Sequence, residues 1–385
     1  MERGVNTRCL HLEETEGKTE NYGALSYPIY QTATYAHKGV GKSTGYDYSR
    51  LQNPTREHLE KVVANLEFGI DAFALSTGMA AITLLMEIFE PGDHIIAEAD
   101  LYGGSIRLFD NVSKKNHYEF TYINCSKDDI ESAIRKNTKA IYIETPTNPM
   151  MNISDIAKIA EIAKKNKLIL IVDNTFLSPY FQNPLKLGAD VVIHSGTKFL
   201  GGHNDTLAGF IVTNNKEIQE KLRFLIKTTG AGLSPFDSWL ILRGIKTLGI
   251  RMEKSQENAL KLATWLKQQD VVTDVFYPGL PEHLGFDIIK KQASGFGSMI
   301  TFNVDSKEHA LKILENVKMI KFAESLGGVE TLITYPDTQT HADVPEEIRL
   351  MNGITPCTLR ISTGIEDIED LINELTDVFK NLESF

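Results

Sequence analysis

From about residue 57 onwards, short apolar runs alternate with longer helical stretches, and this alternation restricts the fold more than any other feature of the sequence. The apolar runs are continuous, which is typical of strands that are buried on both faces. They lie at residues 94–97, 120–123, 140–143, 168–172, 191–194 and 209–212. Helical stretches between several of them, at 130–135 and 156–165, indicate crossover connections. We therefore predict an α/β fold with a mostly parallel central sheet and helices on both faces.

The length of the chain predicts more than one domain, because 385 residues exceed what a single hydrophobic core usually supports. A long helical pattern at 239–268 leads into a second α/β region, and we place a boundary near residue 245. We expect a cofactor-binding domain at 57–245 and a smaller C-terminal α/β domain at 246–385. Residues 1–56 are turn-rich and aromatic without sustained periodicity, so we expect an arm that covers a surface of another subunit.

Composition excludes several classes of function. The net charge of −11 argues against a nucleic-acid-binding protein, which needs a basic face to neutralise phosphates. No apolar run reaches the roughly 18 residues that span a bilayer, and the start of the chain has no apolar core of a secretion signal. Cys9, Cys125 and Cys357 lie far apart, without a CxxC pair. We expect reduced thiols, a cytoplasmic location, and no metal site.

Three predicted strand ends carry groups that can take part in catalysis. One strand runs into Asp173, and the strand at 191–194 runs into a loop that contains Ser195, Thr197 and Lys198. A third strand, at 73–75, enters a turn that opens a helix, where free backbone N–H groups favour an anion. Taken singly, a helix-capping aspartate and a solvated lysine are ordinary features. Ligands of open parallel sheets bind beyond these strand ends, however, so we expect the three groups to meet.

Together the three junctions match the needs of one cofactor, pyridoxal phosphate. This cofactor needs a lysine that binds its aldehyde carbon, a carboxylate that keeps its pyridine nitrogen protonated, and a phosphate cradle. Lys198 would supply the amine and Asp173 the carboxylate. The cradle would be formed by the turn with Gly78 and Met79, together with the hydroxyl groups of Ser195 and Thr197.

Ordered motifs along nearly the whole chain are similar to those of the Cys/Met-metabolism family of pyridoxal-phosphate enzymes. This family includes cystathionine γ-synthase, cystathionine γ- and β-lyases, methionine γ-lyase and O-acetylhomoserine sulfhydrylases. The matching stretches are YSR at 48–50, NPTR at 53–56, LYGG at 101–104, ETPTNP at 144–149, VDNTF at 172–176, SGTK at 195–198, ESLGGVE at 324–330 and LRISTG at 359–364. The resemblance implies the PLP-dependent transferase fold of the aspartate-aminotransferase type.

The resemblance also implies roles for residues around the cofactor. Tyr48 and Arg50 would reach the cofactor phosphate of a neighbouring subunit, and Thr175 would also contact the cofactor. Tyr102 would stack on the pyridine ring and act in proton transfer, with a phenol pKa lowered by nearby cations. The family implies a homotetramer built from two dimers that share their active sites.

Further residues are implied to bind the substrate. Arg360 would hold the α-carboxylate of the substrate, helped by Asn148 and Ser325. Lys198, once freed from the cofactor, would move protons between the Cα and Cβ atoms of the substrate and the cofactor. These steps make chemistry at the γ carbon of a sulfur amino acid or an O-acylhomoserine possible.

Few residues separate the reactions within the family. Glu324 stands where γ-synthases and γ-lyases carry a glutamate, and Gly104 replaces a cysteine that is usual in methionine γ-lyases. Arg107 stands near the expected distal end of an acylated homoserine, and Leu51 replaces a second arginine of enzymes that use O-succinylhomoserine. We favour γ-replacement, in which O-acetylhomoserine and cysteine form cystathionine. Sulfide is a second candidate for the nucleophile. The alternative is a lyase that splits cystathionine or methionine.

Other classes of function have weaker support. A Gly-Lys-Ser sequence at 41–43 resembles the end of a phosphate-binding loop, but the glycine that such a loop requires would fall on Ala36. No G-x-G-x-x-G motif follows an early strand, so a Rossmann dehydrogenase is not expected. A regulator that binds the cofactor or an amino acid without turnover would be expected to lack Lys198, Asp173 or Arg360, and the chain has all three.

Overall fold

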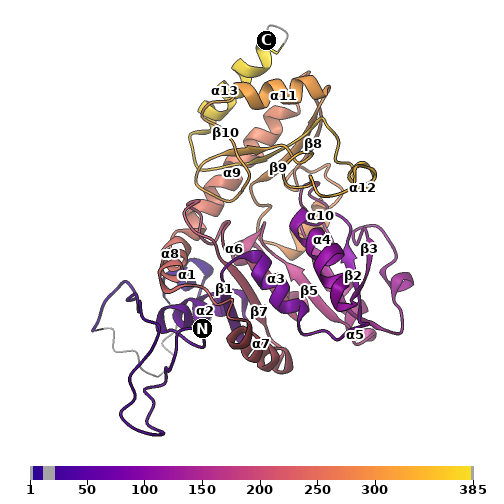
Figure 1. Ribbon diagram of the computed structural model, residues 1–385. Coiled ribbons are helices and arrows are strands. Elements are labelled where there is room, and N and C mark those ends of the chain that lie inside the picture. Colours follow the sequence, from indigo (N-terminus) through magenta and orange to yellow (C-terminus); the bar gives the residue numbers. More distant parts are fainter. Residues whose placement is uncertain (1–2, 12–21, 383–385) are drawn as a thin grey trace.

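Two β-sheets organise the structure, a computed structural model that describes residues 3–11 and 22–382 (Figure 1). The larger sheet has seven strands and the smaller has five. In spatial order, the larger sheet consists of β1 (Asp71–Leu75), β7 (Gly209–Thr213), β6 (Val191–Ser195), β5 (Ile169–Asp173), β4 (Thr138–Glu144), β2 (His94–Glu98) and β3 (Glu119–Ile123).

The seven-stranded sheet is parallel except at one strand. Each pairing from β6 through β5, β4 and β2 to β3 is parallel, whereas β7 runs antiparallel to both of its neighbours. The prediction of a mostly parallel sheet is therefore confirmed. In such an arrangement the carboxyl ends of β4, β5 and β6 lie side by side at one edge, which is where the candidate site forms.

Helices cover both faces of this sheet, as predicted. Leu170 and Val172 of β5 pack into one hydrophobic cluster, while Ile171 between them packs into another. The first cluster includes side chains of α2 (Pro54–Glu67) and α5 (Ile156–Lys165), and the second includes side chains of α3 (Gly78–Met86) and α7 (Lys216–Thr229). Burial on both faces explains why the strand sequences are continuously apolar.

The smaller sheet belongs to a C-terminal α/β domain (Figure 1). Its strands, in spatial order, are β10 (Lys321–Phe322), β11 (Leu332–Thr334), β12 (Thr358–Ser362), β9 (Met299–Val304) and β8 (Val272–Phe276). Three helices pack their apolar side chains on it in one cluster: α9 (Leu248–Leu266), α11 (Lys307–Asn316) and α13 (Ile368–Lys380).

Shorter helices complete the described part of the chain. They are α1 (Val5–Leu10), α4 (Gly103–Arg107), α6 (Ser178–Phe181), α8 (Pro235–Ile245), α10 (Phe286–Gln292) and α12 (Glu346–Met351), a π-helical turn η1 (Leu108–Val112), and the 3₁₀ turns η2 (Ser113–Asn116), η3 (Ile130–Ala133) and η4 (Pro184–Leu187).

Two expected helices differ from the structure. The pattern at 239–268 is not one helix, because α8 ends at Ile245 and α9 begins at Leu248. The break is stabilised by side chains that satisfy the carbonyl oxygen of Gly244, which accepts hydrogen bonds from Thr247 Oγ1 at 3.2 Å and Arg251 Nη2 at 2.9 Å. The stretch at 130–135 forms only the 3₁₀ turn η3, since so short a segment rarely sustains an α-helix. A division of the chain at 1–56, 57–245 and 246–385 remains our proposal.

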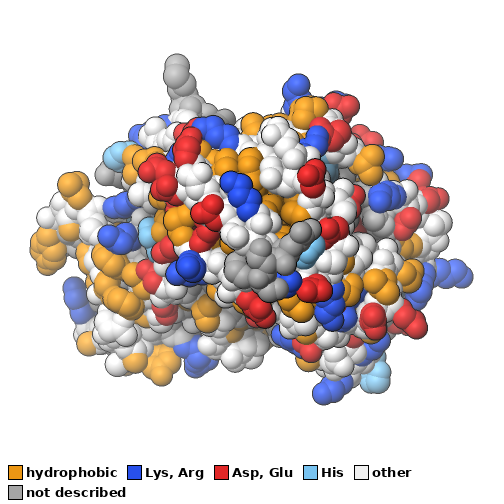
Figure 2. All heavy atoms as spheres, turned by 90° about the horizontal axis from the view of Figure 1, so that it is seen from above, with side chains coloured by type: hydrophobic (Ala, Val, Ile, Leu, Met, Phe, Trp, Pro, Cys, Tyr) orange, Lys and Arg blue, Asp and Glu red, His pale blue; other side chains and the backbone are white. Residues whose placement is uncertain are grey.

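The predicted N-terminal arm is described from residue 22 onwards, and its residues 1–2 and 12–21 lie outside the described residues. Between residues 22 and 53 it forms neither helix nor sheet strand, and it extends from the body in Figure 1. Figure 2 shows acidic and basic side chains interspersed over the face seen there, without a patch of one sign. No helix in the described part of the chain is long and apolar enough to cross a membrane.

Candidate functional site

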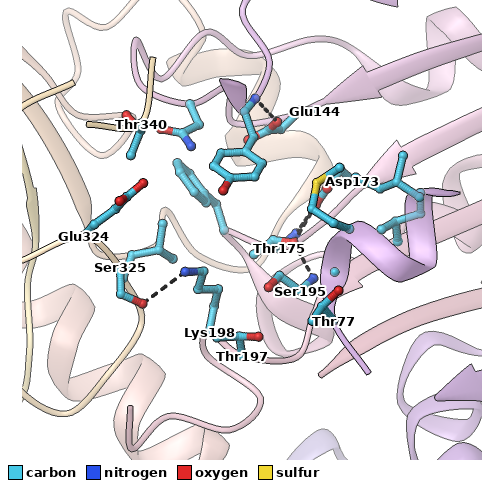
Figure 3. Close-up of a pocket in the computed structure, with 18 of the residues that line it drawn as sticks. Thr77, Glu144, Asp173, Thr175, Ser195, Thr197, Lys198, Glu324, Ser325 and Thr340 are labelled. Carbon is cyan, nitrogen blue, oxygen red and sulfur yellow. Dashed lines mark hydrogen bonds between the residues drawn. The ribbon is translucent and has the colours of Figure 1, made fainter. Parts of the chain in front are cut away.

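A cavity of about 350 Å³ lies beyond the carboxyl ends of the central parallel strands (Figure 3). One wall comes from the ends of β4, β5 and β6 and from the start of α3, and the opposite wall comes from β12 and the loop after β10. The predicted residues that line it are Gly78, Met79, Tyr102, Asn148, Asp173, Thr175, Ser195, Thr197, Lys198, Glu324, Ser325 and Arg360.

Lys198 lies in the turn after β6 and points its amine into the cavity (Figure 3). The turn is fixed by backbone hydrogen bonds, since Lys198 N donates to Ser195 O at 3.2 Å and Gly202 N donates to Lys198 O at 2.7 Å. The amine donates to Ser325 Oγ at 3.0 Å. Burial, and then the positive charge of Arg360, lower the pKa of Lys198 to about 8. A lysine in this state is ready to act as a nucleophile or a base near neutral pH.

Asp173 is the last residue of β5 and is 9% exposed. Its Oδ1 accepts hydrogen bonds from Thr175 N at 3.0 Å and Thr175 Oγ1 at 2.6 Å. Burial raises the pKa of Asp173, because no described cation forms an ion pair with it to offset the loss of water. A buried carboxylate of this kind is stabilised by a bound cation.

The first turn of α3 faces the cavity beside the loop after β6. Thr77 caps the helix, and its Oγ1 accepts a hydrogen bond from Ala80 N at 2.9 Å. A Cβ atom at Gly78 would lie 3.0 Å from the Cβ of Ser195, so glycine lets the two segments approach closely. The first N–H groups of a helix have no partner within it and favour anions. With the hydroxyl groups of Ser195 and Thr197 nearby, this corner suits a phosphate.

Arg360 enters the cavity from β12 and is 1% exposed. Its Nη1 donates to Asn148 Oδ1 at 2.7 Å, and its Nη2 donates to Ser325 O at 3.1 Å and Thr334 Oγ1 at 3.2 Å. Its buried Nε finds no acceptor among the described residues. Burial lowers the pKa of Arg360 to about 10. The fixed guanidinium with an unused N–H suits a carboxylate ligand.

Tyr102 lines the cavity, and the charges of Arg360 and Glu144 act on its phenol. Its backbone N–H donates to Glu144 Oε2 at 3.0 Å. The expectation of a lowered phenol pKa is wrong in this structure, where burial and the negative charge of Glu324 raise the pKa of Tyr102 and outweigh the cations Arg107 and Arg360. In the described structure this phenol is therefore a proton donor rather than a base.

Three predicted site residues lie outside the cavity of their own chain. Tyr48 is 44% exposed, and the Arg50 guanidinium donates to the carbonyl oxygen of Lys227. Arg107 forms an ion pair with Asp343 at 2.5 Å, with more than half of each side chain exposed. The structure does not bring these residues to Lys198.

The structure adds cavity residues that were not predicted. Thr77, Glu144, Leu207 and Thr340 line the cavity. Glu144 follows an apolar strand in the same way as Asp173, so the rule that identified Asp173 could have identified it. The hydroxyl group of Thr340 and the side chain of Leu207 come from irregular segments, and nothing in the sequence pattern distinguishes them.

The residues present fit pyridoxal phosphate by the chemistry of their groups. The amine of Lys198 with its lowered pKa suits the aldehyde, the buried Asp173 suits the pyridine nitrogen, and the Gly78 corner suits the phosphate. No group of three His, Cys, Asp or Glu side chains in the described part of the chain is placed to hold a metal ion.

Comparisons with known proteins point to the same cofactor. Residues 6–380 match the family described as Cys/Met metabolism PLP-dependent enzyme. Cystathionine gamma-lyase of Bacillus subtilis is 50% identical over 364 residues, which cover 94% of this chain and 96% of that protein. Cystathionine gamma-synthase/O-acetylhomoserine (thiol)-lyase of the same organism is 49% identical, covering 92% and 91%. Cystathionine beta-lyase of Lactococcus lactis is 46% identical, covering 98% and 99%.

A solved structure has the same fold. Cystathionine gamma-lyase from Lactobacillus plantarum, complexed with L-serine, superposes with a TM-score of 0.95 at 42% identity. The similarity covers 99% of this chain and 100% of that one. The PLP-dependent transferase fold expected from the sequence is therefore confirmed.

Proposed function

We propose a reaction for this chain, which belongs to the Cys/Met metabolism family of PLP-dependent enzymes: γ-replacement, in which O-acetylhomoserine and cysteine form cystathionine and acetate. Relatives of similar identity carry the names of synthases and of lyases, so the names alone do not select the reaction. The proposal therefore depends on how the cavity is arranged.

The cofactor, when bound, supplies a cationic ring that accepts electrons and so allows protons to leave the Cα and Cβ atoms of the substrate. We assign Asp173 to the ring nitrogen and Arg360, with Asn148, to the α-carboxylate of the substrate. The Lys198 amine then moves protons between Cα and Cβ, which general acid–base catalysis requires. Tyr102 holds a proton that it can donate, because its pKa is raised.

The observation that carries the proposal is the free carboxylate of Glu324, which lies across the cavity from Asp173 (Figure 3). Glu324 forms no hydrogen bond or ion pair with any other described residue, whereas Arg360 makes three hydrogen bonds and keeps its Nε without an acceptor among the described residues. A cavity with an arginine for a carboxylate and a separate carboxylate for an ammonium suits two amino-acid ends. This supports cysteine as the nucleophile.

Acetyl is favoured as the leaving acyl group because the cavity offers no spare cation for a second carboxylate. Of the described cations, only Lys198 and Arg360 line the cavity. Arg107, the cation expected near the acyl group, is paired with Asp343 outside it. A succinyl group would bring an unpaired negative charge next to Glu324, which is unfavourable.

A lyase that splits cystathionine is the second candidate. It is favoured by the 50% identity to a cystathionine gamma-lyase. The same two-ended cavity would accept cystathionine, which has an amino-acid group at each end. That reaction would consume water and release cysteine, a 2-oxo acid and ammonia.

We also propose that the active sites are shared between subunits in a cytoplasmic homotetramer. Tyr48 and Arg50 lie outside the cavity of their own chain, and both remain accessible to another subunit in the described structure. An arginine fork from a second subunit would complete the phosphate corner beside Gly78.

A product assay tests the proposed reaction. Purified enzyme with pyridoxal phosphate is given O-acetylhomoserine with and without cysteine, and then cystathionine or methionine alone. Cystathionine formation that depends on cysteine supports γ-replacement. Rapid release of a 2-oxo acid and ammonia from cystathionine, with no cystathionine synthesis, would contradict γ-replacement and support the lyase.

A further inference from the structure

Two buried carboxyl groups lie side by side at the strand ends of the cavity. Glu144 ends β4 and Asp173 ends β5, and the register of these parallel strands pairs the two residues directly. Both line the cavity, and they are only 4% and 9% exposed (Figure 3). Directly paired residues in neighbouring strands have their side chains on the same face, about 5 Å apart.

The surroundings do not supply charges that would allow both groups to ionise. Neither carboxyl forms an ion pair with a described residue. Asp100, just after the end of β2, adds further negative charge near Glu144. The positive group that faces Glu144 from β12 is Arg360, whose guanidinium is already engaged by Asn148. Two adjacent carboxylates in such a site hold one proton between them.

Hydrogen bonds decide which group holds that proton. Asp173 accepts two hydrogen bonds from Thr175, and a cationic pyridine nitrogen would add a third partner. Glu144 accepts one, from the backbone N–H of Tyr102. His194, on the strand next to β5, also favours the charged form of Asp173. The anion is therefore better stabilised at Asp173 than at Glu144.

We propose that Glu144 is a neutral carboxylic acid in the resting enzyme, and that its proton allows Asp173 to remain an anion for the cofactor. Glu144 is thus a positioning residue that acts through Asp173 and through the Tyr102 backbone. Burial, and then the charge of Asp173, raise the pKa of Glu144 in agreement with this assignment. The inference depends on the cofactor and not on which reaction the enzyme performs.

Infrared spectroscopy tests the protonation state directly. Apoenzyme labelled with carboxyl-¹³C glutamate is compared at pH 7 with Glu144→Gln and with the matched control Glu98→Gln. Glu98 is the appropriate control because burial raises its pKa to about 8, although it does not line the cavity. We expect one label-sensitive band of a protonated acid to disappear in Glu144→Gln and a different one in Glu98→Gln. An unchanged spectrum in Glu144→Gln would overturn the proposal.

If Glu144→Gln does not fold, the infrared spectrum of the wild-type protein provides a second test. Addition of pyridoxal phosphate to the labelled apoenzyme should shift the Glu144 band, since Glu144 lines the cavity whereas the buried Glu98 does not. If no protonated glutamate responds to the cofactor, the proposal is refuted.

The pH midpoint of the cofactor absorbance provides an independent measurement. Replacing a neutral acid by glutamine changes no charge, so the midpoint in Glu144→Gln should stay within a few tenths of a unit of wild type. If Glu144 were an anion, the loss of a charge close to the cofactor would lower the midpoint by about one to three units. That larger shift would also overturn the proposal.

Discussion

The two walls of the cavity each carry a carboxylate, and these two carboxylates differ in how firmly they are held. On the wall formed by β4, β5, β6 and α3, Asp173 is 9% exposed and fixed by two hydrogen bonds. On the opposite wall, in the loop after β10, Glu324 is exposed and has no described partner. The buried wall around Asp173 suits a cofactor that stays bound, and the exposed Glu324 suits ligands that change. The cofactor and the substrate are therefore expected to bind to different kinds of side chain, the cofactor to buried and fixed groups and the incoming substrate to an exposed and unpaired one.

Lys198→Ala should give the largest effect, because it removes the nucleophile and proton carrier of the buried wall. We expect activity to fall by about 10²- to 10⁴-fold, the contribution of a positioned acid–base group. Circular dichroism should remain unchanged. Lys321→Ala, in the exposed strand β10, is the matched control and should keep near-normal activity. Equal losses of activity in Lys198→Ala and Lys321→Ala would contradict the special role of Lys198.

The rate at which apoenzyme captures pyridoxal phosphate should depend steeply on pH. The neutral Lys198 amine is the reactive form, and its pKa is about 8 because it is buried. The rate should rise about tenfold per unit up to pH 8 and level off above it. Stopped-flow absorbance between pH 6 and 10 measures this. A rate that continues to rise beyond pH 10 would show an unshifted, solvated lysine.

Arg360→Lys should raise the KM for the amino-acid substrate more than it lowers kcat. Lysine keeps the charge but loses the planar fork, and a hydrogen bond to a charged group contributes about 1.5–3 kcal/mol. We expect kcat/KM to fall roughly 10- to 150-fold. Cofactor absorbance should be unchanged, and its loss would show that Arg360 belongs to the cofactor site instead.

Glu324→Gln should have the smallest measurable effect, because the side chain of Glu324 is exposed. Exposed ion pairs contribute about 0.2–1 kcal/mol, so the KM for cysteine should rise up to about fivefold. The KM for O-acetylhomoserine should change less. Arg107→Ala is the control, because Arg107 is paired with Asp343 outside the cavity, and its kinetics should match wild type within about twofold. A larger effect of Arg107→Ala than of Glu324→Gln would contradict the assignment.

The sequence predicted the larger sheet and the buried wall well because both depend on local patterns. Strands covered on both faces must be apolar throughout, and groups that follow them must lie at one edge. Lys198, Asp173 and the Gly78 turn were found in this way and line one cavity.

Three other features could not be predicted because each depends on burial or on segments that are distant in the sequence. Whether Arg107 faces the cavity depends on Asp343, which is 236 residues away in the sequence. The pKa of Tyr102 depends on burial and on Glu324, and a motif contains no information on either. The break between α8 and α9 depends on Arg251, whose side chain reaches back to Gly244.

The most direct test of the account is to locate the cofactor. Borohydride reduction of the enzyme loaded with pyridoxal phosphate fixes the cofactor on the lysine that binds it, and peptide mass spectrometry then identifies that residue. The account predicts a single pyridoxyl group on Lys198, with the yellow absorbance lost at the same time. A stable, stoichiometric label on any other lysine, with Lys198 unmodified, would contradict it.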